Sequence, residues 1–409
     1  MNVVPAAELS SAKKRGTGSW LRSPQRLFLR RAIFQVHLWS GLILALYAVV
    51  IGLTGSALIF KGEIDRAIYP SLYHITPVPK QLTLDQAVRR IQSKHPDWVG
   101  FALLNIDNRE QATDLLMRPA KRASTPNYRV VSFNPYTGEV LLDRLRYAGI
   151  LGFLSNLHVY LLSGEQGLLV SGWMAIGLLL LCISGLILWW PGVQRWASAL
   201  RLKSTGNWRR VNWDLHTVVG FWSSAAFLLV ILTGIDFAFP APSGRILDLV
   251  MGGGSHAAGV SPGASSRTPS NAPILTIDQA VAATRRALPA DAPPGYLQLP
   301  STPQAPYRAT GYYKEALPYS QLVRIALDSH TGALLAISDT RKESRGARVE
   351  QSFVALHFGL FGGAGPLGLL VKCFWVLLGM APALLAITGL LMYWNRSLRM
   401  IWRRMRLRA

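Results

Sequence analysis

Long apolar stretches alternate with polar segments along the chain. Four apolar stretches have about the 20 residues that a helix needs to cross a bilayer. They are residues 32–60, 167–192, 215–235 and 373–394. The segments at 61–166 and 236–366 are polar and long enough to fold outside the membrane. The pattern predicts a membrane α-helical protein with four transmembrane helices and two extramembrane segments.

The two halves of the chain resemble each other, which indicates an internal duplication. His37 and Thr54 in the first apolar stretch are spaced like His216 and Thr233 in the third. The second and fourth stretches share a hydroxyl–glycine pair, and the polar segments share a longer motif. These matches are Ser184-Gly185 with Thr388-Gly389, and Leu82-Thr-Leu-Asp-Gln-Ala-Val88 with Leu275-Thr-Ile-Asp-Gln-Ala-Val281.

The motif in the polar segments predicts the start of a helix in each half. Thr83 and Thr276 are each followed three residues later by Gln, which is the signature of a capping box. Alternating apolar residues come later, broken by turns that end in Gly138 and Gly332 and are typical of β-hairpins. Each external unit is therefore predicted to be a small α+β domain. The Gly/Ser/Pro-rich residues 252–273 are predicted to be a linker.

Composition narrows the class of protein. Of the 409 residues, 50% are hydrophobic and 16% are charged, whereas an average soluble protein has about 25% charged residues. The 13 Trp, 13 Tyr and 14 Phe exclude a disordered chain. Two cysteines are too few for a disulfide framework. An ordinary soluble enzyme is therefore not expected.

The positive charge predicts the orientation of the chain. The net charge is +22, and basic residues concentrate at 13–31, 195–210 and 396–408, beside the apolar stretches. The positive-inside rule places both termini and the central loop in the cytoplasm. Topology and contact with the lipid bilayer explain this charge, so no nucleic-acid partner is expected. The predicted location is the bacterial inner membrane, with the external units in the periplasm.

These observations predict nine segments. The basic cytoplasmic segments are 1–31, 193–213 and 396–409, and the first and third transmembrane helices are 32–60 and 214–239. The periplasmic domains are 61–148 and 240–348. Residues 149–192 and 349–395 each contain an amphipathic segment followed by a transmembrane helix.

Four of the eight histidines lie in or beside the apolar stretches, where an ionisable residue is a functional candidate. His37 and His216 lie about one turn inside the cytoplasmic ends of their helices, and His158 and His357 precede the other two helices at the periplasmic boundary. The remaining histidines fall in expected linkers and turns and are predicted to be solvated. They are His74, His95, His256 and His330.

Facing helices of a duplicated bundle can supply two neutral imidazoles to one haem iron. Gly41 and Gly220 lie one turn after His37 and His216 and leave room for a flat macrocycle. We predict two b-type haems with bis-His ligation, whose four axial ligands to the iron are His37, His216, His158 and His357. Depth favours pairing His37 with His216 and His158 with His357, although the sequence alone leaves the pairing open. Covalent attachment is excluded because no Cys-x-x-Cys-His occurs.

Two other interpretations of the histidines remain. Zinc would need a set of carboxylate or thiolate partners, and the expected set does not accompany these histidines. Alternatively, each histidine has only a structural role and bonds a backbone carbonyl. No catalytic side chain is predicted, because no nucleophile stands in a Ser/His/Asp or Cys/His arrangement.

The chain resembles the PepSY-associated transmembrane helix family of bacterial inner-membrane proteins over nearly its whole length. The resemblance is carried by Arg30-Arg31 before His37-Leu-Trp-Ser-Gly41, the two Leu-Thr-Leu/Ile-Asp-Gln-Ala motifs, and the segments around His158 and His357. It implies that the external units are PepSY-like domains. Some members of the family are dihaem reductases that release iron from ferric siderophores in the periplasm.

The resemblance implies a membrane-bound oxidoreductase that takes a ferric siderophore as substrate. No Gly-x-Gly-x-x-Gly turn, the signature of a dinucleotide-binding module, follows a strand in this sequence. The resemblance therefore also implies a separate cytoplasmic or quinol electron donor. One alternative is a non-redox PepSY membrane protein that binds or regulates a periplasmic peptide or protease. Another is a component of siderophore uptake.

Overall fold

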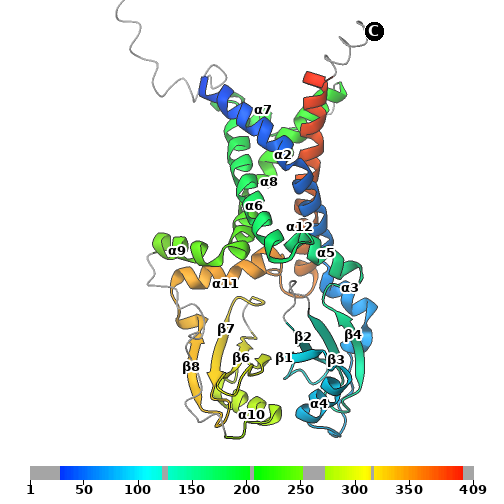
Figure 1. Cartoon of the computed structure of the whole chain (residues 1–409). Coiled ribbons are helices and arrows are strands. Elements are labelled where there is room, and N and C mark those ends of the chain that lie inside the picture. The colour runs from blue at the N-terminus through cyan, green and yellow to red at the C-terminus, as the bar shows by residue number, and fades with distance from the viewer. Residues whose placement is uncertain (1–27, 122–127, 203–206, 252–271, 315–316, 399–409) are drawn as a thin grey trace, which may run out of the picture. The chain divides into compact units, whose positions relative to one another are not determined.

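A computed structural model describes residues 28–121, 128–202, 207–251, 272–314 and 317–398 (Figure 1). Most of the predicted linker, His256 and nearly all of both basic tails lie outside these residues. The chain divides into two compact units. The first, here called the helical unit, contains the chain up to Ser56, Trp173–Leu232 and the chain from Leu377 onward. The second, here called the sheet unit, contains Ala57–Gly172 and Thr233–Val376.

Four helices of the described residues are long and apolar enough to cross a membrane, as predicted. They are α2 (Phe28–Leu58), α6 (Gly164–Trp189), α8 (Trp208–Ala238) and α12 (Pro366–Tyr393). Helix α8 begins before the predicted residue 214, because Asn207 Oδ1 accepts a hydrogen bond from the Arg209 N–H at 3.2 Å and starts the helix in the polar segment.

Small residues bring two of these helices into close contact in the helical unit. A Cβ on Gly52 of α2 would lie 2.5 Å from the carbonyl oxygen of Gly379 on α12, and a Cβ on Gly379 would lie 2.4 Å from Ser56 Oγ. Such glycines let membrane helices approach each other closely. Pro382 lies inside α12 near this contact, and its ring would be 3.4 Å from the same Gly52 Cβ.

Short helices adjoin the spans at the sheet-unit ends. They are α3 (Lys61–Ile68) after α2, α5 (Gly149–Tyr160) before α6, α9 (Pro240–Met251) after α8 and α11 (Arg345–His357) before α12. In the loop between α6 and α8, α7 covers Trp196–Ala199. Helices α5 and α11 correspond to the two predicted amphipathic segments, and each carries its histidine in the last turn.

The strands of both halves belong to one eight-stranded sheet of order β4-β3-β2-β1-β5-β6-β7-β8. The first four strands are β1 (Trp98–Leu104), β2 (Thr113–Pro119), β3 (Arg129–Phe133) and β4 (Val140–Leu145). The other four are β5 (Pro294–Gln298), β6 (Tyr307–Tyr312), β7 (Leu322–Leu327) and β8 (Leu334–Asp339). All neighbouring strands are antiparallel, and the halves join where β1 pairs with β5, with Leu103 opposite Leu297.

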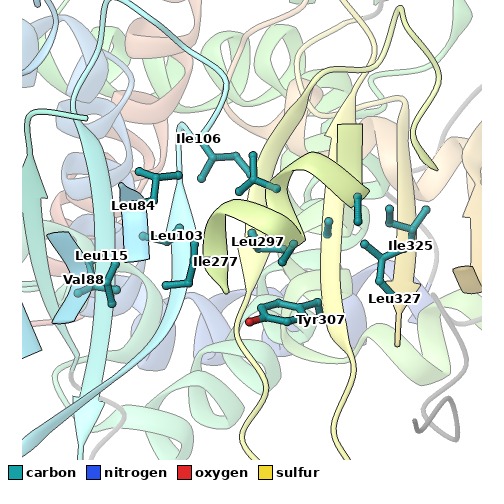
Figure 2. Packing of buried hydrophobic residues seen from close by; sticks show 14 of the residues in the cluster. Leu84, Val88, Leu103, Ile106, Leu115, Ile277, Leu297, Tyr307, Ile325 and Leu327 are labelled. Carbon is teal, nitrogen blue, oxygen red and sulfur yellow. The ribbon is translucent and has the colours of Figure 1, made fainter. Parts of the chain in front are cut away.

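One hydrophobic core runs through both halves of the sheet unit (Figure 2). Leu103, Leu115, Leu297 and Ile325 on the strands are fully buried, at 0% exposure. Helices α4 (Leu84–Lys94) and α10 (Ile277–Ala287) bury their apolar sides in the same core. The sequence predicts two separate α+β units, whereas this core and the β1–β5 pairing join the two repeats.

The predicted helix starts and turns are confirmed. Thr83 and Thr276 each accept a hydrogen bond from the backbone N–H three residues on, and the Gln side chain at that position completes both capping boxes. Gly138 and Gly332 have φ angles of +69° and +72° in the β3–β4 and β7–β8 turns. Most L-residues are strained in this conformation, whereas glycine adopts it freely.

The prediction that the remaining histidines are solvated is wrong for His330. Only 8% of its surface is exposed. Its two ring nitrogens lie 3.1 and 3.0 Å from the carbonyl oxygens of Pro273 and Pro303, so the imidazole N–H donates to a backbone carbonyl. His74 is exposed as predicted, and His95 Nε2 lies 3.3 Å from Asp143 Oδ2.

Candidate functional site

His37 lies on α2 and contacts α6 within the helical unit. Its Nδ1 is 2.9 Å from Ser184 Oγ. The Ser184 hydroxyl donates its own hydrogen to the Leu181 carbonyl at 2.9 Å, so it is an acceptor for His37. The proton of a neutral His37 is therefore on Nδ1, and Nε2 carries the lone pair that a metal needs.

His216 on α8 has the same arrangement with α12. Its Nδ1 is 2.9 Å from Thr388 Oγ1. That hydroxyl donates to the carbonyls of Leu384 and Leu385 at 2.8 and 3.1 Å, so it also accepts from the imidazole. The buried Asn212, one turn before His216, donates from Nδ2 to the Thr388 carbonyl at 3.0 Å. Two contacts from α8 thus hold Thr388, and His216 Nε2 is left as the basic nitrogen.

His37 and His216 both belong to the helical unit. His37 comes from the first half of the chain and His216 from the second, at repeat-equivalent positions. The structure therefore brings together, within one unit, the two histidines that depth alone paired.

His158 and His357 lie together in the sheet unit. Their ring centroids are 6.4 Å apart, with an angle of 64° between the ring planes. A metal bound by two opposed imidazole nitrogens at about 2 Å each requires ring centres about 6 Å apart. The separation of these rings therefore fits a shared axial pair.

A hydroxyl and two aromatic side chains contact His357. Thr233 Oγ1 is 2.8 Å from His357 Nδ1. The Phe237 ring lies 5.2 Å from the imidazole, edge to face, and Trp375 Nε1 donates to the His357 carbonyl at 3.2 Å. This arrangement fixes the end of α11 and orients the imidazole through its Nδ1 side.

A glycine follows each of these hydroxyl residues and contacts the same imidazole. A Cβ would lie 3.2 Å from His37 Cε1 at Gly185, 3.4 Å from His216 Cε1 at Gly389, and 3.7 Å from His357 Cε1 at Gly234. At the first two positions a side chain would crowd the ring. The hydroxyl–glycine pair is therefore a seat for the histidine. The hydroxyl bonds Nδ1, as an acceptor in the case of Ser184 and Thr388, and the glycine leaves room for the ring.

Sequence reasoning missed the role of these pairs. It used Ser184-Gly185, Thr388-Gly389 and Thr233-Gly234 only as markers of the duplication, together with the fourth copy, Thr54-Gly55. The sequence has four membrane-associated histidines and four hydroxyl–glycine pairs, each at a repeat-equivalent position. This equality in number was the signal that could have linked the pairs to the histidines. The sequence predicts that Gly41 and Gly220 leave room for a macrocycle. A Cβ on Gly41 would lie 3.6 Å from the Leu181 side chain, and a Cβ on Gly220 would lie 3.6 Å from the Leu385 side chain.

A family model described as the PepSY-associated TM region matches residues 34–396, so the chain belongs to this family. The match includes all four spans and the sheet unit between them, and it makes the chain a multi-pass membrane protein. A comparison with curated proteins finds no match.

Proposed function

We propose that the chain is a haem-containing membrane reductase that passes electrons across the membrane to the iron of a ferric siderophore. The observation that carries the proposal is the common seat of His37, His216 and His357. Each imidazole directs Nδ1 to a hydroxyl, which leaves Nε2 as the coordinating nitrogen. A purely structural histidine needs neither a repeated seat nor a partner imidazole at 6.4 Å.

Two b-type haems would be held by the four histidines, one by His37 and His216 and the other by His158 and His357. A bound haem would supply one-electron redox chemistry at each pair. The residues of the chain orient the imidazoles, set their tautomer through Ser184, Thr388 and Thr233, and keep water away with apolar helix faces. The aromatic residues around His357 give that pair a low-dielectric surrounding.

The proposed orientation places both termini in the cytoplasm and the sheet unit in the periplasm of a bacterial inner membrane. The positive-inside rule supports this orientation through the basic segments at 13–31, 195–210 and 396–408. Electrons come from a separate cytoplasmic or quinol donor. The ferric chelate accepts one electron, Fe(III) becomes Fe(II), and the chelator releases iron because its hard oxygen ligands bind the less charged ion more weakly.

The test is a spectrum and a turnover measurement on the purified, detergent-solubilised chain. We expect two non-covalent b-type haems per chain and the sharp reduced bands of low-spin haem after dithionite. Mixing the reduced protein with a ferric siderophore should reoxidise it and release Fe(II), which a ferrous chelator traps quantitatively. A chain that stays colourless after haem supplementation would contradict the proposal and favour the non-redox alternative, a PepSY protein that binds a peptide or protease.

A further inference from the structure

The guanidinium of Arg146, just after β4, lies among aromatic rings in the sheet unit. Its Cζ is 4.6 Å from the centre of the Tyr128 ring and 5.4 Å from that of Tyr147. Tyr147 in turn contacts Tyr160 edge to face, with centroids 6.0 Å apart. Arg146 is exposed and forms no ion pair with any residue that the structure describes. A planar cation is thus held in place while its charge remains available.

The positive charge around Arg146 is only partly neutralised. Arg144 has a partner, since its guanidinium lies 3.3 Å from Asp65. Lys61, at the start of α3, has no such partner among the described residues. Burial lowers the pKa of Lys61, and the nearby charge of Arg146 lowers it further, against the opposing effect of Asp65. The two unpaired cations, Lys61 and Arg146, repel each other and would be stabilised by an anion.

The tyrosines add hydrogen-bond donors to this charge. Burial raises the pKa of Tyr147 to about 12, and Tyr160 raises it too, while Arg146 acts in the opposite direction. Its phenol is therefore protonated at neutral pH and can donate to an anionic oxygen. We define the Arg146 patch as Lys61, Tyr128, Arg146, Tyr147 and Tyr160.

The Arg146 patch is adjacent in the chain to one of the candidate axial ligands. His158 and Tyr160 share the last turn of α5, separated by about 3 Å of helical rise. Leu161 ends the helix there in a left-handed conformation, with φ of 46°. Side chains two residues apart point to different faces of a helix, so the patch shares α5 with His158 but uses a different face of that helix.

The second half of the chain lacks the patch. Counted from His158 and His357, Tyr160 corresponds to Gly359, Tyr147 to Gly346 and Arg146 to Arg345. A Cβ on Gly346 would lie 2.9 Å from Asp248 Oδ1, because α9 packs against α11 at this place. Both halves build the same fold, so the fold itself does not require the aromatic residues of the patch.

We infer that the Arg146 patch binds the substrate, and that this substrate is an anionic metal chelate with flat aromatic ligands. Three features select this chemistry: two unpaired cations, phenol donors, and ring faces on which a planar ligand can stack. The aromatic rings around Arg146 favour a soluble aromatic chelate over a lipid headgroup, because a headgroup has no flat ring to stack on them. The inference rests on the proposed function, because it takes the bound chelate to be the substrate of the proposed reduction.

Equilibrium dialysis tests the inference with the full-length protein in phosphatidylcholine nanodiscs. The probe is the gallium(III) complex of enterobactin, a trianionic tris-catecholate that accepts no electron. We expect Arg146→Gln to weaken binding about tenfold, which corresponds to one charge-assisted hydrogen bond. Arg146→Lys keeps the charge but loses the planar stacking, so its affinity should lie between the two. Lys61→Gln should weaken binding in the same direction.

Arg345→Gln is the matched control, because Arg345 is the exposed counterpart of Arg146 in the second half and should leave binding unchanged. Equal losses in both variants would overturn the inference, since they would reflect the overall charge of the chain. So would equally tight binding of the cationic gallium complex of desferrioxamine B. Loss of probe binding when phosphatidylglycerol is added to the nanodiscs would assign the patch to lipid headgroups instead.

The two proposals fail separately. A chain without haem that still binds the gallium complex through Arg146 would refute the proposed function and leave the patch in place. A haem-containing reductase whose Arg146 variants bind the probe like the parent would refute the patch and leave the function in place.

Discussion

The hydroxyl of Thr388 is the smallest group on which the haem proposal can be tested. Thr388→Val keeps the shape of the side chain and removes the acceptor for His216 Nδ1. Loss of such a partner typically lowers metal affinity about 10–100-fold, and we expect this loss for haem at the His37–His216 pair. The imidazole also becomes a weaker donor, so the reduction potential of that haem should rise. Haem titration and spectroelectrochemistry measure both effects.

Thr217→Val provides the control for this change. Thr217 is next to His216 on the same helix, but within the described part of the chain its hydroxyl bonds only to the carbonyls of Trp213 and Asp214. Haem affinity and potential should both stay at the parent values. Equal effects of the two substitutions would mean that loss of any hydroxyl near His216 lowers haem affinity. That result would contradict a specific role for the Thr388 hydroxyl.

Asp114 predicts a pH effect on stability at the residue scale. Burial raises its pKa, against the hydrogen bond that its Oδ1 accepts from Ser132 Oγ at 2.5 Å. Because the folded pKa lies above the unfolded value, the ionised carboxyl destabilises the fold, and stability is lost as pH rises through the folded pKa. Asp114→Asn should therefore melt at a higher temperature than the parent at pH 7, with the difference vanishing near pH 3.5.

Thermal melts of both proteins across this pH range check the prediction, and Asp97→Asn is the control because its side chain is exposed. A stabilisation by Asp114→Asn that is the same at both pH values would contradict it, since the effect would then not depend on ionisation.

The candidate site was partly predictable from single residues. Histidines in apolar stretches stand out because an ionisable side chain is costly there, so the sequence alone selects all four as candidates. Ser184 and Thr388 did not stand out, because a hydroxyl in a helix commonly bonds the carbonyl of its own preceding turn. Both residues do so, and the second role of each oxygen depends on which helix lies opposite, which the local sequence does not encode.

At the scale of elements, the N-termini of α4 and α10 cap each other. Asp278 of α10 accepts from the backbone N–H of Leu84 at 3.2 Å and of Asp85 at 3.0 Å, and it pairs with Lys80 at 2.9 Å. Asp85 returns one bond, from the Ile277 N–H at 3.3 Å. Asp278→Ala should cost about 1–2 kcal/mol of unfolding free energy, the usual loss for a capping side chain. Asp85→Ala should cost less, because it removes one such bond. Urea unfolding of the variants measures both.

An exposed aspartate separates capping from general charge. Asp107 pairs with Arg285 at 2.9 Å on the surface of the same unit, and such pairs contribute at most about 1 kcal/mol. Asp107→Ala should therefore be the mildest of the three substitutions. If Asp107→Ala lowers the unfolding free energy as much as Asp278→Ala does, the mutual capping of α4 and α10 does not stabilise the fold more than an exposed ion pair.

Local elements were the most predictable part of the fold, because capping boxes, glycine turns and long apolar stretches are determined by residues that are neighbours in the sequence. The pairing of β1 with β5 was not predictable in this way. The alternation that buries Leu103 and Leu297 specifies a face of each strand but not the neighbouring strand. His330 was misplaced for a similar reason, since the carbonyls that it satisfies come from distant residues.

At the scale of the whole molecule, each half of the duplication contributes to both units. The helical unit contains His37 from the first half and His216 from the second, and the sheet unit contains His158 and His357 in the same way. The β1–β5 pairing joins the halves of the sheet unit as well. Neither half alone contains a complete pair, so the duplication itself assembles the candidate site.

Double substitutions decide which histidines share a haem. His37→Ala with His216→Ala should remove one haem and leave the other with its low-spin spectrum, because the His158 and His357 rings remain 6.4 Å apart. His37→Ala with His158→Ala should remove both, since each pair then has a single imidazole. The measurement is haem per chain by the pyridine haemochrome method, with electron paramagnetic resonance for the spin state. If the pairs were crossed, with His37 sharing an iron with His158, the two double variants would exchange their results.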